Sequence, residues 1–175
     1  MMGAGHYLVF TLSDQTFGIE VQKIREVLSF RNITPLPETQ SFARGIISQR
    51  GIILPVFELR EKLQLPTRDY SRFHVIIVVE IGGKRMGVIA DEISGLLEIL
   101  PDETQKNGSL AFGLRPEYLV GVGNKGERII FILDIDQMLN TDKLEGERNN
   151  GQNSVNRRQQ IDWSYSDGNI EQARA

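Results

Sequence analysis

The glycines at residues 121–126 are the first candidate for ligand chemistry. This segment reads GVGNKG and matches the G-x-G-x-x-G pattern of loops that bind the pyrophosphate of dinucleotides. Such a loop binds phosphate because a helix N-terminus follows the glycines. Here an apolar run of strand composition follows instead, at residues 128–132. We therefore predict a hairpin turn in this segment and no phosphate site.

Carboxylates and histidines are the remaining candidates for acid–base catalysis or metal binding. Three acidic pairs stand at predicted strand ends or turns, where solvated or capping side chains are expected. They are Asp91 with Glu92, Asp102 with Glu103, and Asp134 with Asp136. Neither His6 nor His74 has a partner visible in the sequence, so we expect both to be ordinary surface or half-buried residues. No cysteine is present for a disulfide or a thiolate metal site. The sequence predicts no catalytic residue, no metal and no cofactor, and hence no enzyme.

Length and composition limit the class of protein further. The 175 residues suffice for one large domain or two small ones, and the 40% hydrophobic and 25% charged content is typical of a soluble globular chain. A net charge of −3 and a pI near 5.5 disfavour a nucleic-acid-binding surface. No apolar run reaches the length of a membrane span, and the first ten residues lack the pattern of a signal peptide. We expect a cytoplasmic protein.

Alternating apolar residues and closely spaced turn residues predict an all-β fold. Strands are predicted at residues 7–12, 17–21, 52–57, 75–81, 85–90 and 128–132, with hairpin turns at 13–15, 82–84 and 124–126. Short helices are predicted at residues 22–26, 37–42, 116–118 and 135–139. Pro55 interrupts the strand at 52–57 and predicts an edge position, because proline cannot donate to a central ladder.

The chain contains an internal repeat. A shift of 69 positions aligns ten residues of matching character, including Gly18 with Gly87, and a shift of 76 aligns the later part of each copy, including Phe57 with Leu133. Each copy contains about five short strands, and units of this kind tend to close into small barrels because closure removes exposed edges. The turn at Arg50 and Gly51 is expected to match residues 125–126. One continuous sandwich with generic strand patterning is the alternative.

The last 35 residues differ from the rest. Only eight residues of the segment 141–175 are hydrophobic, so this segment cannot bury enough apolar area to offset its ordering entropy. We predict a polar, mostly disordered tail. Trp163 and Tyr165 are either an incidental aromatic pair or part of a short docking peptide.

Several motifs in fixed order resemble the CheW family of chemotaxis coupling proteins. They are YLVFTL at residues 7–12, FGI at 17–19, PLP at 35–37, GII at 45–47, RG at 50–51, PVFELR at 55–60 and GVIAD at 87–91. The resemblance spans residues 7–139. It implies two SH3-like five-stranded β-barrels packed together within one CheW-like domain, residues 1–140. The two intertwined subdomains would divide near residue 70, and the N-terminal strand could cross over between them.

The resemblance also implies a function. A protein of this family is a non-enzymatic adaptor that couples chemoreceptors to the CheA histidine kinase in bacterial chemotaxis, and it is recruited from the cytoplasm to receptor arrays. Its partners would be the receptor cytoplasmic tip and the regulatory domain of the kinase. One alternative is an equivalent adaptor of a twitching-motility or phototaxis pathway. Another is a small-barrel nucleic-acid-binding protein, which the acidic composition disfavours.

Two sets of site residues follow from the resemblance. The receptor-binding set, in a groove between the barrels, is Ile24, Glu26, Val27, Arg50, Ile93 and Leu96. The kinase-binding set is Gly45, Ile46, Ile53, Pro55 and Phe57. Glu26 and Arg50 are expected to pair at the rim. The apolar members of the receptor set could instead belong to the core between the barrels. Ser48 and Gln49 depart from the residues usual in the family before the arginine–glycine turn, and Glu58 stands where aspartate is usual.

Overall fold

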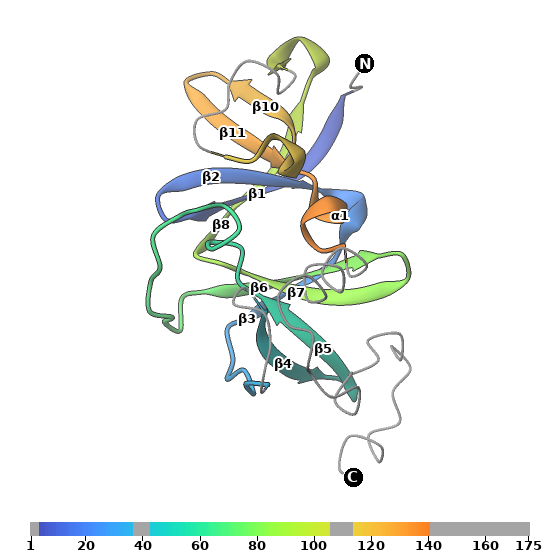
Figure 1. The fold of residues 1–175 in the computed structure, drawn as a ribbon. Helices are drawn as coiled ribbons and strands as arrows, with labels where there is room; N and C mark the ends of the chain where they lie inside the picture. Colours follow the sequence, from blue (N-terminus) through green and yellow to red (C-terminus); the bar gives the residue numbers. More distant parts are fainter. Residues whose placement is uncertain (1–3, 37–42, 106–113, 141–175) are drawn as a thin grey trace, which may run out of the picture.

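Two mixed β-sheets make up most of the computed structural model, which describes residues 4–36, 43–105 and 114–140 (Figure 1). The six-stranded sheet has the order β8 (Glu92–Ile99), β1 (Gly5–Leu12), β2 (Gln15–Glu20), β11 (Arg128–Leu133), β10 (Leu119–Lys125) and β9 (Thr104–Gln105). The five-stranded sheet has the order β3 (Ile24–Ser29), β6 (Val75–Ile81), β7 (Lys84–Ala90), β5 (Ile52–Phe57) and β4 (Ala43–Gln49). The predicted all-β class is confirmed. The predicted tail at 141–175 and the helix at 37–42 lie outside the described residues.

Helical structure in the described ranges is limited to short segments. These are the 3-10 turns η1 (Val21–Lys23), η2 (Pro101–Glu103) and η4 (Pro116–Tyr118), and the helix α1 (Ile135–Met138). The helix predicted at 22–26 is wrong beyond Lys23, because β3 begins at Ile24 and pairs with β6. The β-branched side chains of Ile24 and Val27 favour a strand there. The GVGNKG segment is a hairpin, as predicted: its first five residues end β10 and Gly126 begins the turn.

The internal repeat appears in the structure as two matching sets of strands that exchange their first hairpins. The hairpin β1–β2 of the first copy joins β8, β10 and β11 of the second, and the hairpin β6–β7 of the second copy joins β3, β4 and β5 of the first. In Figure 1 the blue β1 and β2 accordingly lie beside the orange β10 and β11. Each exchanged hairpin meets its host sheet through a parallel pair, Gly18 opposite Ile132 and Gly87 opposite Val56. The glycine match found in the sequence therefore marks the two junctions.

The sheets are not closed into barrels by strand pairing in the part of the chain that the structure describes. Each order runs from one free edge to another, β8 to β9 and β3 to β4. Instead, the chain that leaves one edge strand bends round to the opposite edge. After β3, Thr34 exchanges two hydrogen bonds of 2.9 Å with Ile46 of β4. After β8, η2 leads into β9, which pairs with β10. In each sheet, a short bend of the chain therefore connects the two edges that paired strands would join in a closed barrel.

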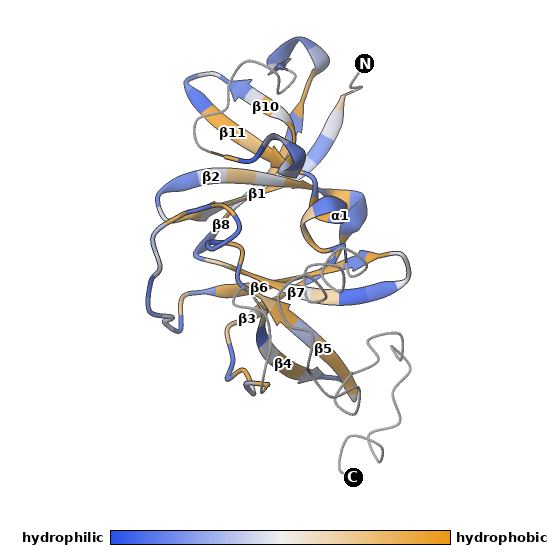
Figure 2. Cartoon of the chain, viewed as in Figure 1, coloured by the Kyte–Doolittle hydropathy of each residue, from blue (hydrophilic) through white to orange (hydrophobic). Residues whose placement is uncertain are grey.

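The hydrophobic core consists of three clusters. One lies on the five-stranded sheet and includes Ile76 and Val78, and another lies on the six-stranded sheet and includes Tyr7 and Val9. The largest is shared between the sheets, where the intervening residues of the same strands, such as Phe10 and Ile77, meet. Strands β1 and β6 are therefore buried on both faces, which explains their continuous apolar sequences. Figure 2 shows this hydrophobic colouring along the paired strands.

The edge position predicted from Pro55 is wrong. Strand β5 lies between β4 and β7. Pro55 is opposite Ile46, whose own N–H and C=O bond to Thr34 rather than to β5. This pair therefore exchanges no ladder hydrogen bonds, and the pairing with β7 includes only the next two residues, Val56 and Phe57. The missing N–H of Pro55 thus costs no ladder bond to β4.

Candidate functional site

The turn between β4 and β5 places Arg50 on the surface in a strained conformation. Arg50 and Gly51 have φ angles of 51° and 79°, the pattern of a two-residue type I′ hairpin turn. The left-handed region costs a residue with a side chain about 1 kcal/mol or more. The strand pairs that close the two equivalent turns are Gln49 with Ile52 and Lys125 with Arg128. Arg50 thus corresponds to Gly126, which corrects by one residue the match expected from the sequence.

The side chain of Arg50 projects into solvent beside strand β3. Its exposed fraction is 80%, and its Nη2 lies 3.9 Å from Oε2 of Glu26. This confirms the expected pairing of these two residues. A pair so exposed stabilises the fold by about 1 kcal/mol at most, so its main effect is to orient the two side chains. Arg31 supports the turn from the other side, because its Nη1 donates to Oε1 of Gln49 at 2.7 Å and to the carbonyl of Ser48 at 3.3 Å.

The apolar residues of the receptor-binding set divide into two kinds. Ile24 and Ile93 are half-buried and pack against the shared core, so the core alternative applies to them. Val27 and Leu96 are 42% and 69% exposed. A bulge at the start of each strand separates the two kinds, because the register of β3 shifts between Ile24 and Glu26 and that of β8 shifts after Ile93. Such bulges re-aim the side chains that follow them.

The kinase-binding set lies on and beneath the edge strand β4. Ile46, on β4, and Ile53, on the neighbouring β5, are half-buried, whereas Pro55 and Phe57 are buried. Phe57 belongs to the shared core. Gly45 is also buried, with a φ of 148° and the carbonyl of Thr34 directly beside it. Only the two isoleucines of this set are therefore partly accessible, and the other three residues position them.

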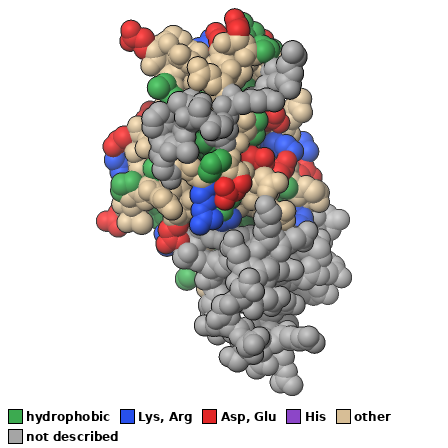
Figure 3. Space-filling view, turned by 45° about the horizontal axis from the view of Figure 1, so that its top comes forward, with side chains coloured by type: hydrophobic (Ala, Val, Ile, Leu, Met, Phe, Trp, Pro, Cys, Tyr) green, Lys and Arg blue, Asp and Glu red, His purple; other side chains and the backbone are tan. Residues whose placement is uncertain are grey.

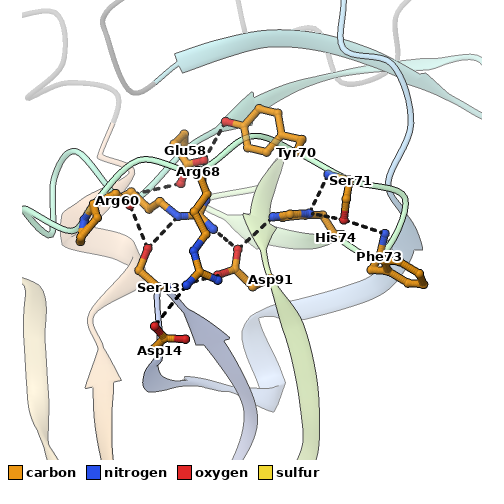
Figure 4. Close-up of polar contacts among 11 residues, drawn as sticks. Ser13, Asp14, Glu58, Arg60, Arg68, Tyr70, Ser71, Phe73, His74 and Asp91 are labelled. Carbon is orange, nitrogen blue, oxygen red and sulfur yellow. Dashed lines mark hydrogen bonds and ion pairs between the residues drawn. The ribbon is translucent and has the colours of Figure 1, made fainter.

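A buried polar cluster, which the sequence did not predict, joins three distant segments (Figure 4). Arg60 has no exposed surface and forms ion pairs with Glu58, at 2.8 Å, and with Asp91. Its Nε donates to Oγ of Ser13 at 3.0 Å, and the backbone N–H of Ser13 donates to Asp91 at 2.8 Å. Asp91 is therefore paired and largely buried. Its position after a strand had predicted a solvated or capping residue, and this prediction is wrong.

His74 also belongs to this polar cluster, and it is buried, whereas an ordinary surface or half-buried residue was expected. Its side chain is 9% exposed and its Nε2 lies 3.1 Å from Oδ1 of Asp91. The backbone N–H of Ser71 donates to Nδ1 at 2.9 Å, which places the proton of the neutral ring on Nε2. Burial lowers the pKa of His74 below its usual value of 6.5, and the nearby Arg60 adds to this. His74 is therefore held in its neutral form near pH 7.

A half-buried tyrosine completes the polar cluster on the Glu58 side. The hydroxyl of Tyr70 donates to Oε2 of Glu58 at 2.7 Å. Burial, followed by the hydrogen bond to Glu58, raises the pKa of Tyr70 far above its usual range. The sequence offered one indirect signal for the whole cluster. Glu58, Arg60 and Asp91 each adjoin a continuous apolar run, where a charge can remain only if it is paired or reaches solvent.

The other acidic residues have the structural roles expected of them. Oδ1 of Asp134 caps α1 by accepting from the N–H of Gln137 at 3.1 Å. Glu103 accepts from the N–H of Leu100 at 2.9 Å, which lowers the pKa of Glu103. Lys23 donates to Oδ2 of Asp136 at 2.8 Å, and this hydrogen bond raises the pKa of Lys23. His6 is exposed on β1, as predicted.

Residues 4–36, 43–105 and 114–140 contain no group of three or more histidine and acidic side chains placed to hold a metal ion. Over the same ranges, no helix is long and apolar enough to cross a membrane.

The chain is similar to proteins of known role. Residues 6–143 match the CheW-like domain. The chain is 30% identical over 138 residues to the chemotaxis protein CheW of Klebsiella aerogenes, covering 79% of this chain and 83% of that protein. It is 29% identical over 137 residues to the protein FrzA of Myxococcus xanthus, covering 77% and 85%. The crystal structure of the scaffolding protein TtCheW from Thermoanaerobacter tengcongensis aligns with a TM-score of 0.70 and 27% identity, covering 77% of this chain and 87% of that one.

Proposed function

This chain belongs to the CheW family of chemotaxis scaffold proteins, and from that premise we propose that it couples the cytoplasmic tips of chemoreceptors to the regulatory domain of a CheA-type histidine kinase. The family consists of non-enzymatic adaptors. An adaptor acts through its surfaces, so the proposal concerns which side chains meet which partner. We propose further that the protein is cytoplasmic and is recruited to receptor arrays.

Arg50 carries the proposal for the receptor surface. A left-handed conformation is unfavourable for arginine, and the equivalent turn in the second copy has Gly126 at this position. Strain of this kind persists where the side chain has a use that outweighs it. The guanidinium is 80% exposed and oriented by Glu26, beside the exposed Val27 on the same strand. A cation next to an apolar residue suits the polar and apolar side chains of a receptor helix.

Strand β8 supplies the second part of the proposed receptor surface. Leu96 is 69% exposed and is equivalent in the repeat to Val27. Ile24 and Ile93, at the starts of the same two strands, pack on the shared core and therefore fix where β3 and β8 begin. The proposed receptor contacts are thus Glu26, Val27, Arg50 and Leu96, with Ile24 and Ile93 beneath them.

The edge strand β4 is the proposed kinase surface. Within the described residues, its outer side is bridged at Ile46 by Thr34, and the carbonyl of Ser48 accepts from Nη1 of Arg31; the rest of this edge is available to a partner. Of the kinase-binding set, Ile46 and Ile53 are partly exposed there, and Gly45, Pro55 and Phe57 hold the two strands in place.

A second candidate is an adaptor of another pathway, such as twitching motility or phototaxis. The chain is nearly as similar to FrzA, at 29% identity, as to the chemotaxis protein of Klebsiella aerogenes, at 30%, so sequence similarity does not single out a relative named for chemotaxis. A nucleic-acid-binding role has less support. The net charge is −3, and among the described residues on the face seen in Figure 3 basic side chains are interspersed with acidic ones.

Binding assays with purified partners test the proposal. Receptor cytoplasmic fragments and kinase regulatory domains encoded in the same genome are titrated with the wild type, Arg50→Gly and Arg85→Ala. Arg85 is an exposed cation on β7 and serves as the matched control. We expect Arg50→Gly to weaken receptor binding at least tenfold while kinase binding and the control stay as in the wild type. Wild-type protein that binds neither partner would overturn the adaptor proposal, and normal receptor binding by Arg50→Gly would overturn the site.

A further inference from the structure

The exchange of hairpins requires the chain to choose between two similar partners. By the repeat, β2 is equivalent to β7, and β5 is equivalent to β11. In the structure β2 pairs in parallel with β11, and β7 pairs in parallel with β5. The unexchanged arrangement would instead pair β2 with β5 and β7 with β11. Both arrangements place an apolar strand beside an equivalent apolar strand, so hydrophobic burial alone discriminates poorly between them.

Charged residues lie within three residues of the end of each of these four strands. Lys23, three residues after β2, donates to Oδ2 of Asp136, three residues after β11, at 2.8 Å. Asp91 directly follows β7 and is paired with Arg60, three residues after β5. The first pair is 35% and 46% exposed, and the second is almost fully buried.

The two ion pairs occupy the same or neighbouring positions of the repeat and have reversed polarity. Arg60 and Asp136 are aligned by the shift of 76, and Asp91 is aligned by the shift of 69 with Gln22, the neighbour of Lys23. The exchanged hairpin of the first copy is followed by a cation, Lys23, and that of the second copy by an anion, Asp91. The strand that pairs with each hairpin is followed by the opposite charge, Asp136 after β11 and Arg60 after β5.

We propose that these two ion pairs of opposite polarity select the exchanged arrangement of hairpins over the unexchanged one. In the unexchanged arrangement Lys23 would lie beside another cation, Arg60. The nearby carboxylate of Glu58 is already paired with Arg60 and would not be free to pair with Lys23. Asp91 would lie beside Asp136, with Asp134, the N-cap of α1, two residues before it. Each crossing would then place like charges together, and in the second case this would occur at a position that buries Asp91.

The energetics of ion pairs agree with a selective role. A buried pair such as Arg60–Asp91 adds little net stability compared with apolar residues of the same size, because both charges lose their hydration. A like-charge contact or an unpaired buried charge, in contrast, costs several kcal/mol. The pairs therefore penalise the wrong arrangement more than they stabilise the right one. Such a penalty matters most when two hairpins have similar apolar faces.

Crosslinking during refolding tests the proposal, and the cysteine-free sequence makes it practical. Gln15 of β2 and Ile129 of β11 are both exposed and lie two residues before the paired Phe17 and Phe131. Cysteines at 15 and 129 therefore report the exchanged arrangement. Cysteines at 15 and 53 report the unexchanged one, because Ile53 is the equivalent of Ile129 in the first copy. Each reporter is refolded by dilution and treated with a short bis-maleimide.

The decisive variant is the charge swap Lys23→Glu/Asp136→Lys. It keeps an ion pair in the exchanged arrangement but would make both contacts of the unexchanged arrangement attractive. We expect the 15–53 product of monomer mass to rise at least threefold above the wild-type background, with a matching fall in the 15–129 product. Lys23→Gln/Asp136→Asn, which removes the pair without reversing it, should give a smaller rise.

Controls separate this effect from a loss of folding. The far-UV circular dichroism and the melting temperature of the charge swap should stay close to those of the wild type, because its native pair is retained. Crosslinking is done at low protein concentration and the product is identified by mass, so exchange between two chains is excluded. A 15–53 product that stays at background in the charge swap would overturn the proposal, whatever the protein binds.

Discussion

The carbonyl oxygen of Thr34 occupies the space that a side chain at Gly45 would need. A Cβ atom at Gly45 would lie 2.0 Å from that oxygen, at a φ of 148°. Thr34 reaches this position because its backbone bonds to Ile46, the next residue of β4. Gly45 thus permits the single bridge that brings the chain after β3 to the opposite edge of its sheet.

Gly45→Ala should therefore lower the free energy of unfolding by several kcal/mol, since the backbone of Thr34 must move. Gly95→Ala is the matched control: its φ is 134°, also unfavourable for alanine, but no atom lies within 4 Å of the added Cβ. Urea denaturation of both variants measures the difference. Equal losses would show that backbone strain, rather than the contact with Thr34, limits this position. A substitution at Gly45 is for the same reason a poor probe of kinase binding.

Arg50→Gly should leave the free energy of unfolding unchanged or raise it by up to about 1 kcal/mol, because it relieves a left-handed arginine. The same substitution at Arg85, within β7, should lower it by about 0.5–1 kcal/mol. Denaturation curves of the two variants test this. A marked loss of stability in Arg50→Gly would mean that the arginine supports the fold, and its strain would then no longer argue for a receptor contact.

Substitution by alanine should lower the free energy of unfolding by different amounts at the two junction glycines, Gly18 and Gly87. At Gly87 a Cβ would lie 2.8 Å from Cγ2 of Ile76 and 3.3 Å from Cγ2 of Val56, whereas at Gly18 the nearest atom, Cγ2 of Ile130, is 3.3 Å away. Overpacking a core costs about 1–3 kcal/mol. We expect Gly87→Ala to fall at the upper end of that range and Gly18→Ala at the lower end, in thermal or urea unfolding. The reverse order would contradict the packing described at these junctions.

Breaking the two ion pairs should have unequal costs. Arg60→Met removes the cation that Glu58 and Asp91 share and leaves Asp91 only the longer contact with Arg68, at 3.8 Å, which should cost about 3–5 kcal/mol. Lys23→Met removes a pair that is 35% and 46% exposed and should cost less than about 1 kcal/mol. Equilibrium unfolding at one pH compares the two directly. Similar losses would mean that solvent reaches Asp91 more freely than its 13% exposure implies.

Stability should fall as the pH is lowered through about 6.5. Burial holds the pKa of His74 below 6.5 in the folded protein, so the unfolded chain takes up a proton first. The stabilisation is therefore complete above pH 6.5 and is lost progressively toward the folded pKa. His74→Gln should flatten this part of the pH profile, measured by urea unfolding between pH 8 and 5.5. His6→Gln, at an exposed position, should keep the slope, and an unchanged slope in His74→Gln would contradict the assignment.

Much of the fold follows from local patterns that the sequence displays. Period-two runs placed the strands at 52–57 and 75–81 with the bounds that the structure has. The repeat paired Gly18 with Gly87 before their junctions were known. Glu26 and Arg50 were matched from the family resemblance, and their contact is present. These features depend on short-range chemistry or on comparison of one half of the chain with the other.

The remaining features depend on contacts between distant segments. Nothing near Asp91 in the sequence announces that Ser13 and Arg60 will surround it, and so it was interpreted as solvated. Pro55 suggested an edge because its neighbours could not show that Thr34 takes the bonds of Ile46. Strands β3 and β8 escaped detection because bulges interrupt their alternation. In each case tertiary structure overrides the local pattern.

The exchanged hairpins also have a consequence for synthesis on the ribosome. Strand β2 is made early, yet its parallel partner β11 is the last strand of the described chain to be translated. The β2 side of the first hairpin must therefore wait, without its parallel partner, until nearly the whole domain has left the exit tunnel. Chains whose pairings span such distances fold slowly and are open to aggregation in the interval. Cotranslational protection by a chaperone that holds apolar segments would act on this hairpin first.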